Sequence, residues 1–372
     1  MDFGFSEEQE MLRAQAQKFL QDQCPISQVR KIIAGEDGYS KVLWQQVADL
    51  GWLGLTIPED QGGLGMDWVD LLVLLEETGR SLFPSPFISN TLALTAISQF
   101  GSHTQQQQWL PLLTDGTKIA TLALLDDEDN YSSSSIQLAG NTNGGGYKLS
   151  GNKSFVQDAQ AADLFVTAFR TGSDSNEIAL ALIPADQKGV SINLTNNLDR
   201  TKPSATLNLD SVSVNSNEII KVGNIPIDHL LNLGALAVSA ESIGVCEAIL
   251  DMTSQYAKDR VQFGHPIGHF QGVKHPLADI YVDIECMKSL TYYAAWSLST
   301  KQEDSELAIA RAKAFSSEKV CNAGVVGIQM HGAIGYTEAY DLQLYLKRSK
   351  WSRAQFGDED FHYDRVATMG GI

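Results

Sequence analysis

The sequence predicts a multidomain α+β protein with an N-terminal α-helical domain, a middle antiparallel β-domain of the barrel or sandwich type, and a C-terminal four-helix bundle. The main observation is the period of the apolar residues, which is helical at first, alternates in the middle, and then becomes helical again. The length of 372 residues agrees, because a chain of this size buries a large core and divides into two or three domains. We place the domains at residues 1–115, 116–224 and 225–372.

The N-terminal segment has helical spacing from Ser6 to about Thr114. One apolar face, for example, is formed by Val42, Leu43, Val47 and Leu50. Pro58 with the glycines that follow it, and Pro84 with Pro86, interrupt the pattern where turns are expected.

The middle region, from about Ile119 to Val222, contains short alternating apolar segments that are separated by clusters of Gly, Asn, Asp and Ser. We expect strands at Ala120–Leu125, Tyr147–Leu149, Leu164–Phe169, Ile178–Ile183, Val190–Leu194 and Thr206–Val214. Short strands without intervening helices are typical of an antiparallel sandwich or barrel, here of about 100 residues.

The last region regains the helical period after Pro226 and keeps it. We expect Asp228 to cap a helix that runs toward Phe263, with Leu236, Ile243 and Leu250 on one face. Further helices are expected at 270–299, 305–330 and 338–354. Four long amphipathic helices predict a bundle.

The charge balance is acidic, with 27 basic and 45 acidic side chains and a net charge of −18. This balance argues against nucleic acid as a partner. It leaves room for an anionic ligand, because a local basic cluster such as that within Lys347–Arg353 matters more than the total. No apolar stretch reaches membrane-spanning length and the N-terminus shows no targeting pattern, so we expect a cytoplasmic protein without a membrane contact.

Cysteine and histidine spacing gives no metal site. The four cysteines form no C-x-x-C pair, which indicates reduced thiols. Four histidines occur at 265, 269, 275 and 331, but Pro266 and Gly268 interrupt any helical face that could hold them together. No carboxylate completes a tetrahedral ligand set, so we expect no metal.

Two runs in the last third of the chain carry the most specific pattern. The first, from Tyr256 to Asp279, reads YAKDRVQFGHPIGHFQGVKHPLAD, and the second, from Gln329 to Arg348, reads QMHGAIGYTEAYDLQLYLKR. Taken singly, Arg260, Phe263 and Gln271 are ordinary helix-end or core residues. The joint pattern is hard to produce by chance, and it resembles the signature of the acyl-CoA dehydrogenase family.

The resemblance covers nearly the whole chain and implies that family's fold, an α-domain, a β-domain and a four-helix α-domain. It also implies FAD as the cofactor, an acyl-CoA thioester as the substrate, an electron-transferring flavoprotein as the acceptor, and a homo- or heterotetramer. In the family, the arginine and glutamine of the first run meet the diphosphate and adenosine of FAD that is bound mainly by a neighbouring subunit. The cofactor-binding residues so implied are Arg260, Phe263, Gln271, Gln329, Gly332 and Gly335.

Two elements that hold a family member's own flavin differ in this chain. The T-E-P-x-A-G-S-D loop of the family corresponds to LALLDDEDNYSSSS at 122–135, which is acidic and has no glycine. The W-I-T triplet corresponds to Phe155, Val156 and Gln157, so an aromatic residue is kept and the threonine is lost. Phe155 and Gln157 remain candidate cofactor contacts.

The catalytic glutamate of the family is also replaced. Counting from Gly335 without a gap places Phe356 at that glutamate, and counting back from Gly244 places Gly234 at the alternative position used by some relatives. Neither residue can accept the α-proton that must leave while a hydride passes to the flavin. The carboxylates that could act as a displaced base are Glu241 and Asp358.

The family motif residues that are kept and those that are replaced favour one type of subunit assembly. Contacts offered to a neighbour's FAD are kept, while those needed for the chain's own chemistry are weakened or missing. We therefore expect FAD-dependent α,β-dehydrogenation of an acyl-CoA by a heteromeric enzyme in which this chain completes the FAD site of a catalytic partner. A self-sufficient homotetramer that uses Glu241 or Asp358 is one alternative. A catalytically inactive family member that acts as a binding or scaffolding protein is the other.

Overall fold

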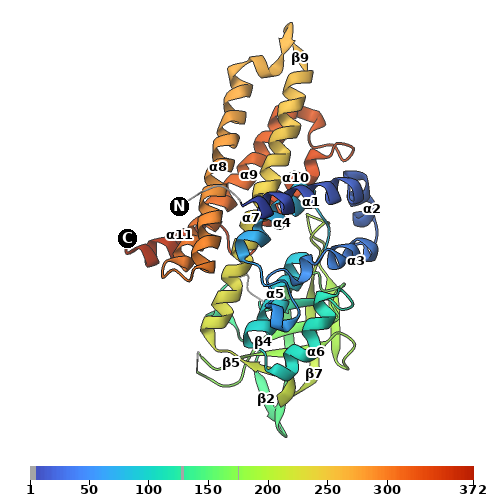
Figure 1. The fold of residues 1–372 in the computed structure, drawn as a ribbon, viewed down its shortest axis with the longest axis vertical. Coiled ribbons are helices and arrows are strands. Elements are labelled where there is room, and N and C mark those ends of the chain that lie inside the picture. The colour runs from blue at the N-terminus through green and yellow to red at the C-terminus, as the bar shows by residue number, and fades with distance from the viewer. Residues whose placement is uncertain (1–5, 127–129, 175) are drawn as a thin grey trace. The chain divides into compact units, whose positions relative to one another are not determined.

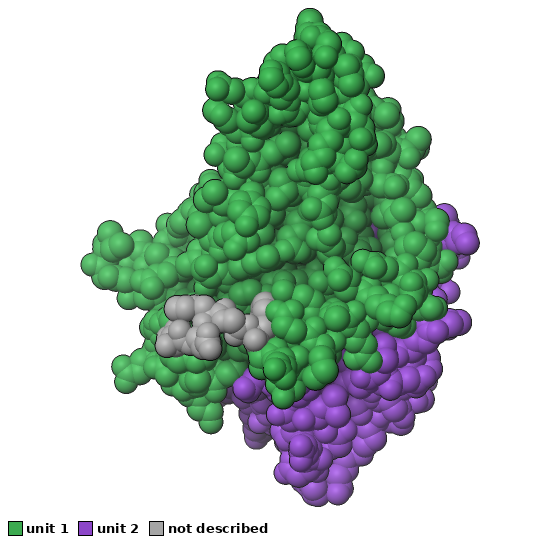
Figure 2. Space-filling view, turned by 45° about the horizontal axis from the view of Figure 1, so that its top comes forward, with its two compact units in different colours: residues 1–30, 68–83, 235–372 green, residues 31–67, 84–234 purple. Residues whose placement is uncertain are grey.

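A computed structural model describes residues 6–126, 130–174 and 176–372 (Figure 1). The chain forms two compact units (Figure 2). We call residues 1–30, 68–83 and 235–372 the helical unit, and residues 31–67 and 84–234 the strand-containing unit. Helices come first along the chain, strands follow and helices return, which confirms the predicted fold class.

The helices before the strands begin where capping chemistry is strong. The hydroxyls of Ser6 and Ser102 each accept a hydrogen bond from the backbone N–H of a glutamine three residues on. The side chain of that glutamine accepts in turn from the backbone N–H of the serine. These helices are α1 Glu7–Gln23, α2 Ile26–Ala34, α3 Lys41–Asp49, α4 Trp68–Arg80, α5 Phe87–Phe100 and α6 His103–Thr114.

Five helices follow the strands in the described part of the chain, three long and two of about a dozen residues, where the sequence predicts four long ones. They are α7 Asn224–Asp259, α8 Gln271–Ser299, α9 Ser305–His331, α10 Leu342–Ala354 and α11 Glu359–Gly370. By length and apolarity α7 could cross a membrane, yet 89% of its most apolar window is buried in the protein. That burial is typical of a core helix.

The start of α7 differs from the prediction that Asp228 is its N-cap. The helix already begins at Asn224, and Pro226 is tolerated in the first turn because N–H groups there have no intrahelical partner. The carboxylate of Asp228 instead accepts hydrogen bonds from the backbone N–H (3.0 Å) and the hydroxyl (2.9 Å) of Ser133. Asp228 therefore holds a loop of the β-region.

Helices α4 and α7 cross at very short range through two glycines. A Cβ at Gly79 would lie 2.0 Å from the carbonyl oxygen of Glu241, and one at Gly244 would lie 1.8 Å from that of Glu76. Both distances are far below van der Waals contact, so the crossing requires glycine on each helix. It also places two glutamates, Glu76 and Glu241, in the interior of this unit.

The strands of the middle region form two four-stranded sheets with the orders β1-β4-β5-β8 and β2-β3-β7-β6. They are β1 Ala120–Ala123, β2 Gly140–Asn143, β3 Gly146–Gln157, β4 Leu164–Arg170, β5 Ile178–Pro184, β6 Val190–Leu194, β7 Ser204–Asn215 and β8 Ile219–Lys221. Neither order closes on itself among the described strands, so the region is a pair of sheets and not a closed barrel. One apolar core contains side chains from both sheets, including Phe165, Phe169, Ile183, Leu149, Leu207 and Val212.

The prediction of a purely antiparallel region is wrong for one strand pair. Strand β1 runs parallel to β4, with Ala120 opposite Leu164, because the chain passes through β2 and β3 of the other sheet before it returns. Strands β2 and β8 are not among the predicted strands. Strand β2 is mostly exposed and has no apolar alternation, and β8 has only three residues, so neither has a readable period.

Candidate functional site

A two-residue turn stands at the tip of the hairpin between α7 and α8, formed by β9 (Val261–Gln262) and β10 (His265–Pro266) (Figure 1). Phe263 and Gly264 make this turn with φ angles of 52° and 81°, the pattern of a type I′ turn. Glycine adopts positive φ freely, whereas a bulky aromatic residue there is strained. The ring makes an edge contact with that of Phe270, with centroids 6.1 Å apart, but Phe263 is still 90% exposed.

Arg260 lies at the base of this hairpin. Its backbone N–H donates to the carbonyl of Tyr256 (2.9 Å), and its carbonyl accepts from the N–H of Ile267 (2.8 Å). The backbone is thus fixed on both sides, while the side chain is exposed. Gln271 is also exposed, at the first position of α8. The first motif run therefore presents a guanidinium, an aromatic ring and an amide to its surroundings.

The structure brings the two motif runs together through Tyr256 and His331. Their rings stack with centroids 4.3 Å apart and planes inclined by 24°. The Nδ1 atom of His331 lies 2.8 Å from the carbonyl oxygen of Gly327. Burial lowers the pKa of His331, so a neutral imidazole stacks on the tyrosine. This contact connects the C-terminal end of α9 to the C-terminal half of α7.

The glycines of the second run have two different roles. Gly332 has φ 64°, and an added Cβ would meet no atom within 4 Å, so its backbone faces open space. Gln329 in the preceding turn is exposed as well. Gly335 has φ −59°, and its Cβ would lie 3.0 Å from that of His331. Packing against the helix end therefore accounts for Gly335, and the positive φ at the C-cap of α9 accounts for Gly332, which faces open space.

Glu241 lies in the interior of α7, where its side chain is 1% exposed. Its Oε1 is 3.2 Å from Nη1 of Arg348 on α10, which is fully buried. The carboxylate charge is thus opposed by an arginine that has no access to water. This geometry describes a structural ion pair.

The segment that follows α10 contains Phe356 and Asp358. Phe356 has φ 57°, and its carbonyl accepts a hydrogen bond from Nε2 of His362 (2.7 Å). Burial, and then the charge of Lys313, lowers the pKa of His362 to about 3, so the imidazole stays neutral. The carboxylate of Asp358 caps α11 by accepting from the N–H of Phe361 (3.1 Å). At both positions the described contacts are structural.

Phe155 and Gln157 lie in the other unit, at the end of β3. The register of β3 with β7 shifts between Lys153 and Val156, and Phe155 has φ 52° at this bulge. The bulge turns the Phe155 ring outward, where it is 44% exposed. Gln157 donates from Nε2 to the carbonyl of Phe155 (3.2 Å), and its buried Oε1 has no hydrogen-bond partner among the described residues. An open aromatic ring and a free acceptor fit a ligand that carries a donor group.

Lys153 is a site residue whose role the sequence reading missed. Its side chain is fully buried, and Nζ contacts a carboxylate oxygen of Asp126 (2.9 Å) and the carbonyl of Leu124 (3.0 Å). Burial lowers the pKa of Lys153 to about 8, although Asp126 opposes this shift. The lysine anchors the start of the segment at 122–135, of which residues 127–129 lie outside the described part. The available signal was its place in the run at 147–156, which resembles a family motif.

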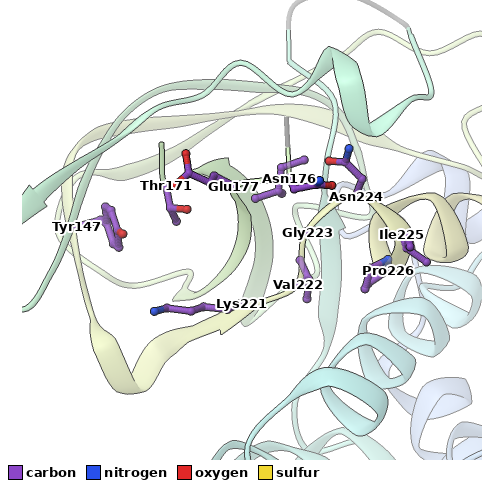
Figure 3. Close-up of a pocket in the computed structure, with 11 residues that line it drawn as sticks. Tyr147, Thr171, Asn176, Glu177, Lys221, Val222, Gly223, Asn224, Ile225 and Pro226 are labelled. Atoms are coloured by element: carbon purple, nitrogen blue, oxygen red, sulfur yellow. The ribbon is translucent and has the colours of Figure 1, made fainter. Parts of the chain in front are cut away.

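A pocket of about 610 Å³ opens elsewhere in the strand-containing unit (Figure 3). Its polar lining includes Tyr147, Glu177, Lys221 and Asn224, from the ends of β3, β5, β8 and α7. None of the residues that the sequence predicts for cofactor binding is among the described residues that line it. We assign it no role.

The family comparisons cover most of the chain. The model for the acyl-CoA dehydrogenase N-terminal domain matches residues 6–117, and that for the acyl-CoA dehydrogenase C-terminal domain matches residues 225–370. The chain is 30% identical over 353 residues to the acyl-CoA dehydrogenase IpdE2 of Mycolicibacterium smegmatis, with 95% of each chain covered.

Two solved structures resemble the whole chain. One is a variant of the Tcur3481–Tcur3483 steroid ACAD, with a TM-score of 0.89, 29% identity and 98% of each chain covered. The other is the ChsE4–ChsE5 complex from Mycobacterium tuberculosis, with a TM-score of 0.91, 26% identity, and 100% of this chain and 99% of that chain covered. The chain therefore belongs to the acyl-CoA dehydrogenase family of oxidoreductases, which act on acyl-CoA.

Proposed function

We propose that this chain is one subunit of a heteromeric acyl-CoA dehydrogenase, in which it completes the FAD site of a catalytic partner. The observation that carries the proposal is the turn at Phe263. A strained aromatic residue that is 90% exposed is not explained by the folding of this chain alone. A second polypeptide or its cofactor that covers the ring would supply the missing stabilisation.

The exposed groups around the turn suit the diphosphate and adenosine end of FAD. Arg260 offers a planar, permanently charged fork for phosphate oxygens, and Gln271 and Gln329 offer amides. Gly332 adds backbone that a cofactor could approach closely. When bound, FAD supplies the acceptor for the hydride that leaves the substrate. The residues of this chain would bind and orient that cofactor.

The surroundings of the candidate bases support the proposal that this chain completes the FAD site of a partner and does not itself remove the proton. Glu241 is held by Arg348 in the interior, and Asp358 caps a helix. Gly234 and Phe356 occupy the two positions at which the family places its glutamate, and neither can take a proton. A general base must reach the proton that it removes, and the described geometry gives this role to none of the four.

The relatives agree with a heteromer. Both solved structures reported above have two-part names, the Tcur3481–Tcur3483 steroid ACAD and the ChsE4–ChsE5 complex. Apolar side chains are also exposed on the helical unit, at Val261, Tyr281, Val282, Val325, Ile334 and Tyr336. Such residues suit an interface with another subunit. We further propose a cytoplasmic enzyme that passes its electrons to an electron-transferring flavoprotein.

The test is the visible spectrum of the chain purified alone and after co-expression with other acyl-CoA dehydrogenase subunits. We expect a colourless chain alone, and a yellow complex that an acyl-CoA bleaches under anaerobic conditions. A chain that is yellow alone and is bleached by an acyl-CoA would support the homotetramer instead. A chain that gives no turnover with any subunit would support the inactive family member.

A matched pair of variants tests the proposed contact. Arg260→Ala should lower FAD retention by the complex, whereas Arg311→Ala, an exposed arginine on α9, should leave it unchanged. Loss of one charge-assisted pair of hydrogen bonds corresponds to roughly tenfold or more in affinity. Equal retention by the two variants would contradict the proposed role of Arg260.

A further inference from the structure

Cys321 and Lys350 form a close pair outside the FAD-binding motifs. Cys321 lies on α9 and Lys350 on α10, and Nζ of the lysine is 2.8 Å from Sγ of the cysteine. Both side chains are partly exposed. The contact thus places a nucleophilic sulfur beside a primary amine, at a point that small molecules can reach.

The other cysteines have different surroundings. Cys24 and Cys246 are buried, and burial raises the pKa of Cys24 to about 12 and raises that of Cys246 further above its ordinary value. Cys286 is exposed on α8, and no hydrogen bond or ion pair is described for it. Within the described part of the chain, Cys321 is therefore the cysteine with a cationic partner. Cys286 provides an exposed reference thiol.

Arg353 lies three residues after Lys350 on α10, and its guanidinium is held by the carboxylate of Glu359. The ammonium of Lys350 is the cation that contacts the sulfur of Cys321. The thiolate is the form of a cysteine that reacts with oxidants. The sulfur and the ammonium together make a small cluster between two helices.

We propose that this cluster is an oxidant-sensitive site at which hydrogen peroxide links Cys321 to Lys350. The thiolate attacks one peroxide oxygen and the O–O bond breaks. The departing hydroxide takes a proton from the Lys350 ammonium, which gives a sulfenic acid, a neutral amine and water. The sulfur is oxidised by two electrons, and the peroxide is reduced.

The second step closes the link. The amine nitrogen of Lys350 attacks the sulfenic sulfur, an S–N bond forms, and the hydroxyl leaves with an amine proton as water. Sulfenic acids are known to condense with nitrogen in this way to give a sulfenamide. The initial separation of 2.8 Å means that neither helix needs to move far. The product joins α9 to α10 covalently.

The test uses the full-length protein in the assembly that it forms, treated with hydrogen peroxide and followed by intact mass and peptide mapping. We expect a species that has lost two hydrogens and contains a peptide joined between Cys321 and Lys350. A thiol reductant should restore the original mass. We also expect Cys321 to be consumed faster than Cys286, because the ammonium 2.8 Å from its sulfur can give a proton to the departing hydroxide.

Two variants separate the link from general oxidation. Lys350→Arg keeps a cation beside the sulfur but removes the primary amine, so Cys321 should still be oxidised quickly and no link should form. Cys286→Ser should leave the link unchanged. Oxidation of Cys321 to sulfinic acid without a linked peptide in the parent protein, or equal rates for the two cysteines, would overturn the proposal. Neither result depends on FAD or on a partner subunit.

Discussion

Arg348 and Glu241 face each other in the interior of the helical unit, with Nη1 and Oε1 3.2 Å apart and side chains that are 0% and 1% exposed. Removing one member of such a pair leaves the other charged and buried, which costs far more than the pair itself contributes. Any substitution of Glu241 therefore has a structural effect first. A loss of activity in such a variant could not, by itself, identify a catalytic base.

The first prediction separates the two roles of Glu241. Glu241→Gln should lower the free energy of unfolding by about 3 kcal/mol, because Arg348 loses its counter-charge. The fraction that remains folded should keep the turnover of the parent complex. Denaturant unfolding and kcat of the same preparation provide the measurement. Glu306→Gln, an exposed glutamate on α9, is the control; a variant of normal stability with abolished turnover would favour the homotetramer.

The second prediction concerns the crossing of α4 and α7. Gly244→Ala should destabilise the protein by roughly 3 kcal/mol or more, since the new Cβ would lie 1.8 Å from the carbonyl oxygen of Glu76. Gly272→Ala in α8 is the matched control, because a Cβ there meets no atom within 4 Å. That change should be neutral or stabilise by up to about 1 kcal/mol. Thermal unfolding of both variants checks the expectation, and equal melting temperatures would refute it.

The third prediction uses the strain at the hairpin. Phe263→Asn creates an Asn-Gly pair, which is the preferred sequence for a type I′ turn. The isolated chain should gain about 0.5–1 kcal/mol in stability, while FAD retention by the complex should fall. Stability of the chain alone and flavin content of the complex are the two readouts. If both improve, the ring has no role in binding.

The fourth prediction follows from Lys313, a residue of α9 that is buried against the C-terminal end of α10. Its Nζ donates to the carbonyls of Ser352 and Arg353, each at 3.1 Å. Burial lowers its pKa from the ordinary 10.5 to about 7, against the opposing charges of Asp358 and Glu359. Between these two pH values the unfolded chain binds more protons than the folded chain. The contribution of this lysine to stability therefore rises with pH above 7.

Urea unfolding of the parent and of Lys313→Met at pH 5, 7 and 9 tests this expectation. The free energy of unfolding of the parent minus that of Lys313→Met should stay constant from pH 5 to 7. It should rise from pH 7 to 9. Lys347→Met, which changes a partly exposed lysine on α10, should show no such trend. A constant difference over the whole range would contradict a lowered pKa.

Much of the helical part follows from the sequence, because long amphipathic helices repeat their signal many times. The expected helices at 270–299 and 305–330 correspond to Gln271–Ser299 and Ser305–His331. The start of α7 was missed because Asp228, a good capping residue, satisfies a loop from another part of the chain. Local chemistry alone does not distinguish these two uses of a carboxylate.

The candidate site was predicted less completely, for a similar reason. Motif spacing identifies Arg260 and Gln329, and the structure shows both exposed. The ion pair of Glu241 with Arg348 depends on a contact between helices far apart in the chain, and no period reveals it. Phe263 taken alone reads as a core residue, yet its turn places it outside. The positive φ of Phe263 in the turn, and not the hydrophobicity of its side chain, decides that the ring is exposed.

The bare ring of Phe263 also bears on the fate of this polypeptide before assembly. Chaperones and proteases recognise exposed apolar segments, and small differences in such exposure change protein abundance in cells. A subunit synthesised in excess over whatever covers its hairpin would display that ring for as long as it stayed unpaired. Cellular quality control would then remove the surplus, and the amount of this chain would follow the amount of its partner.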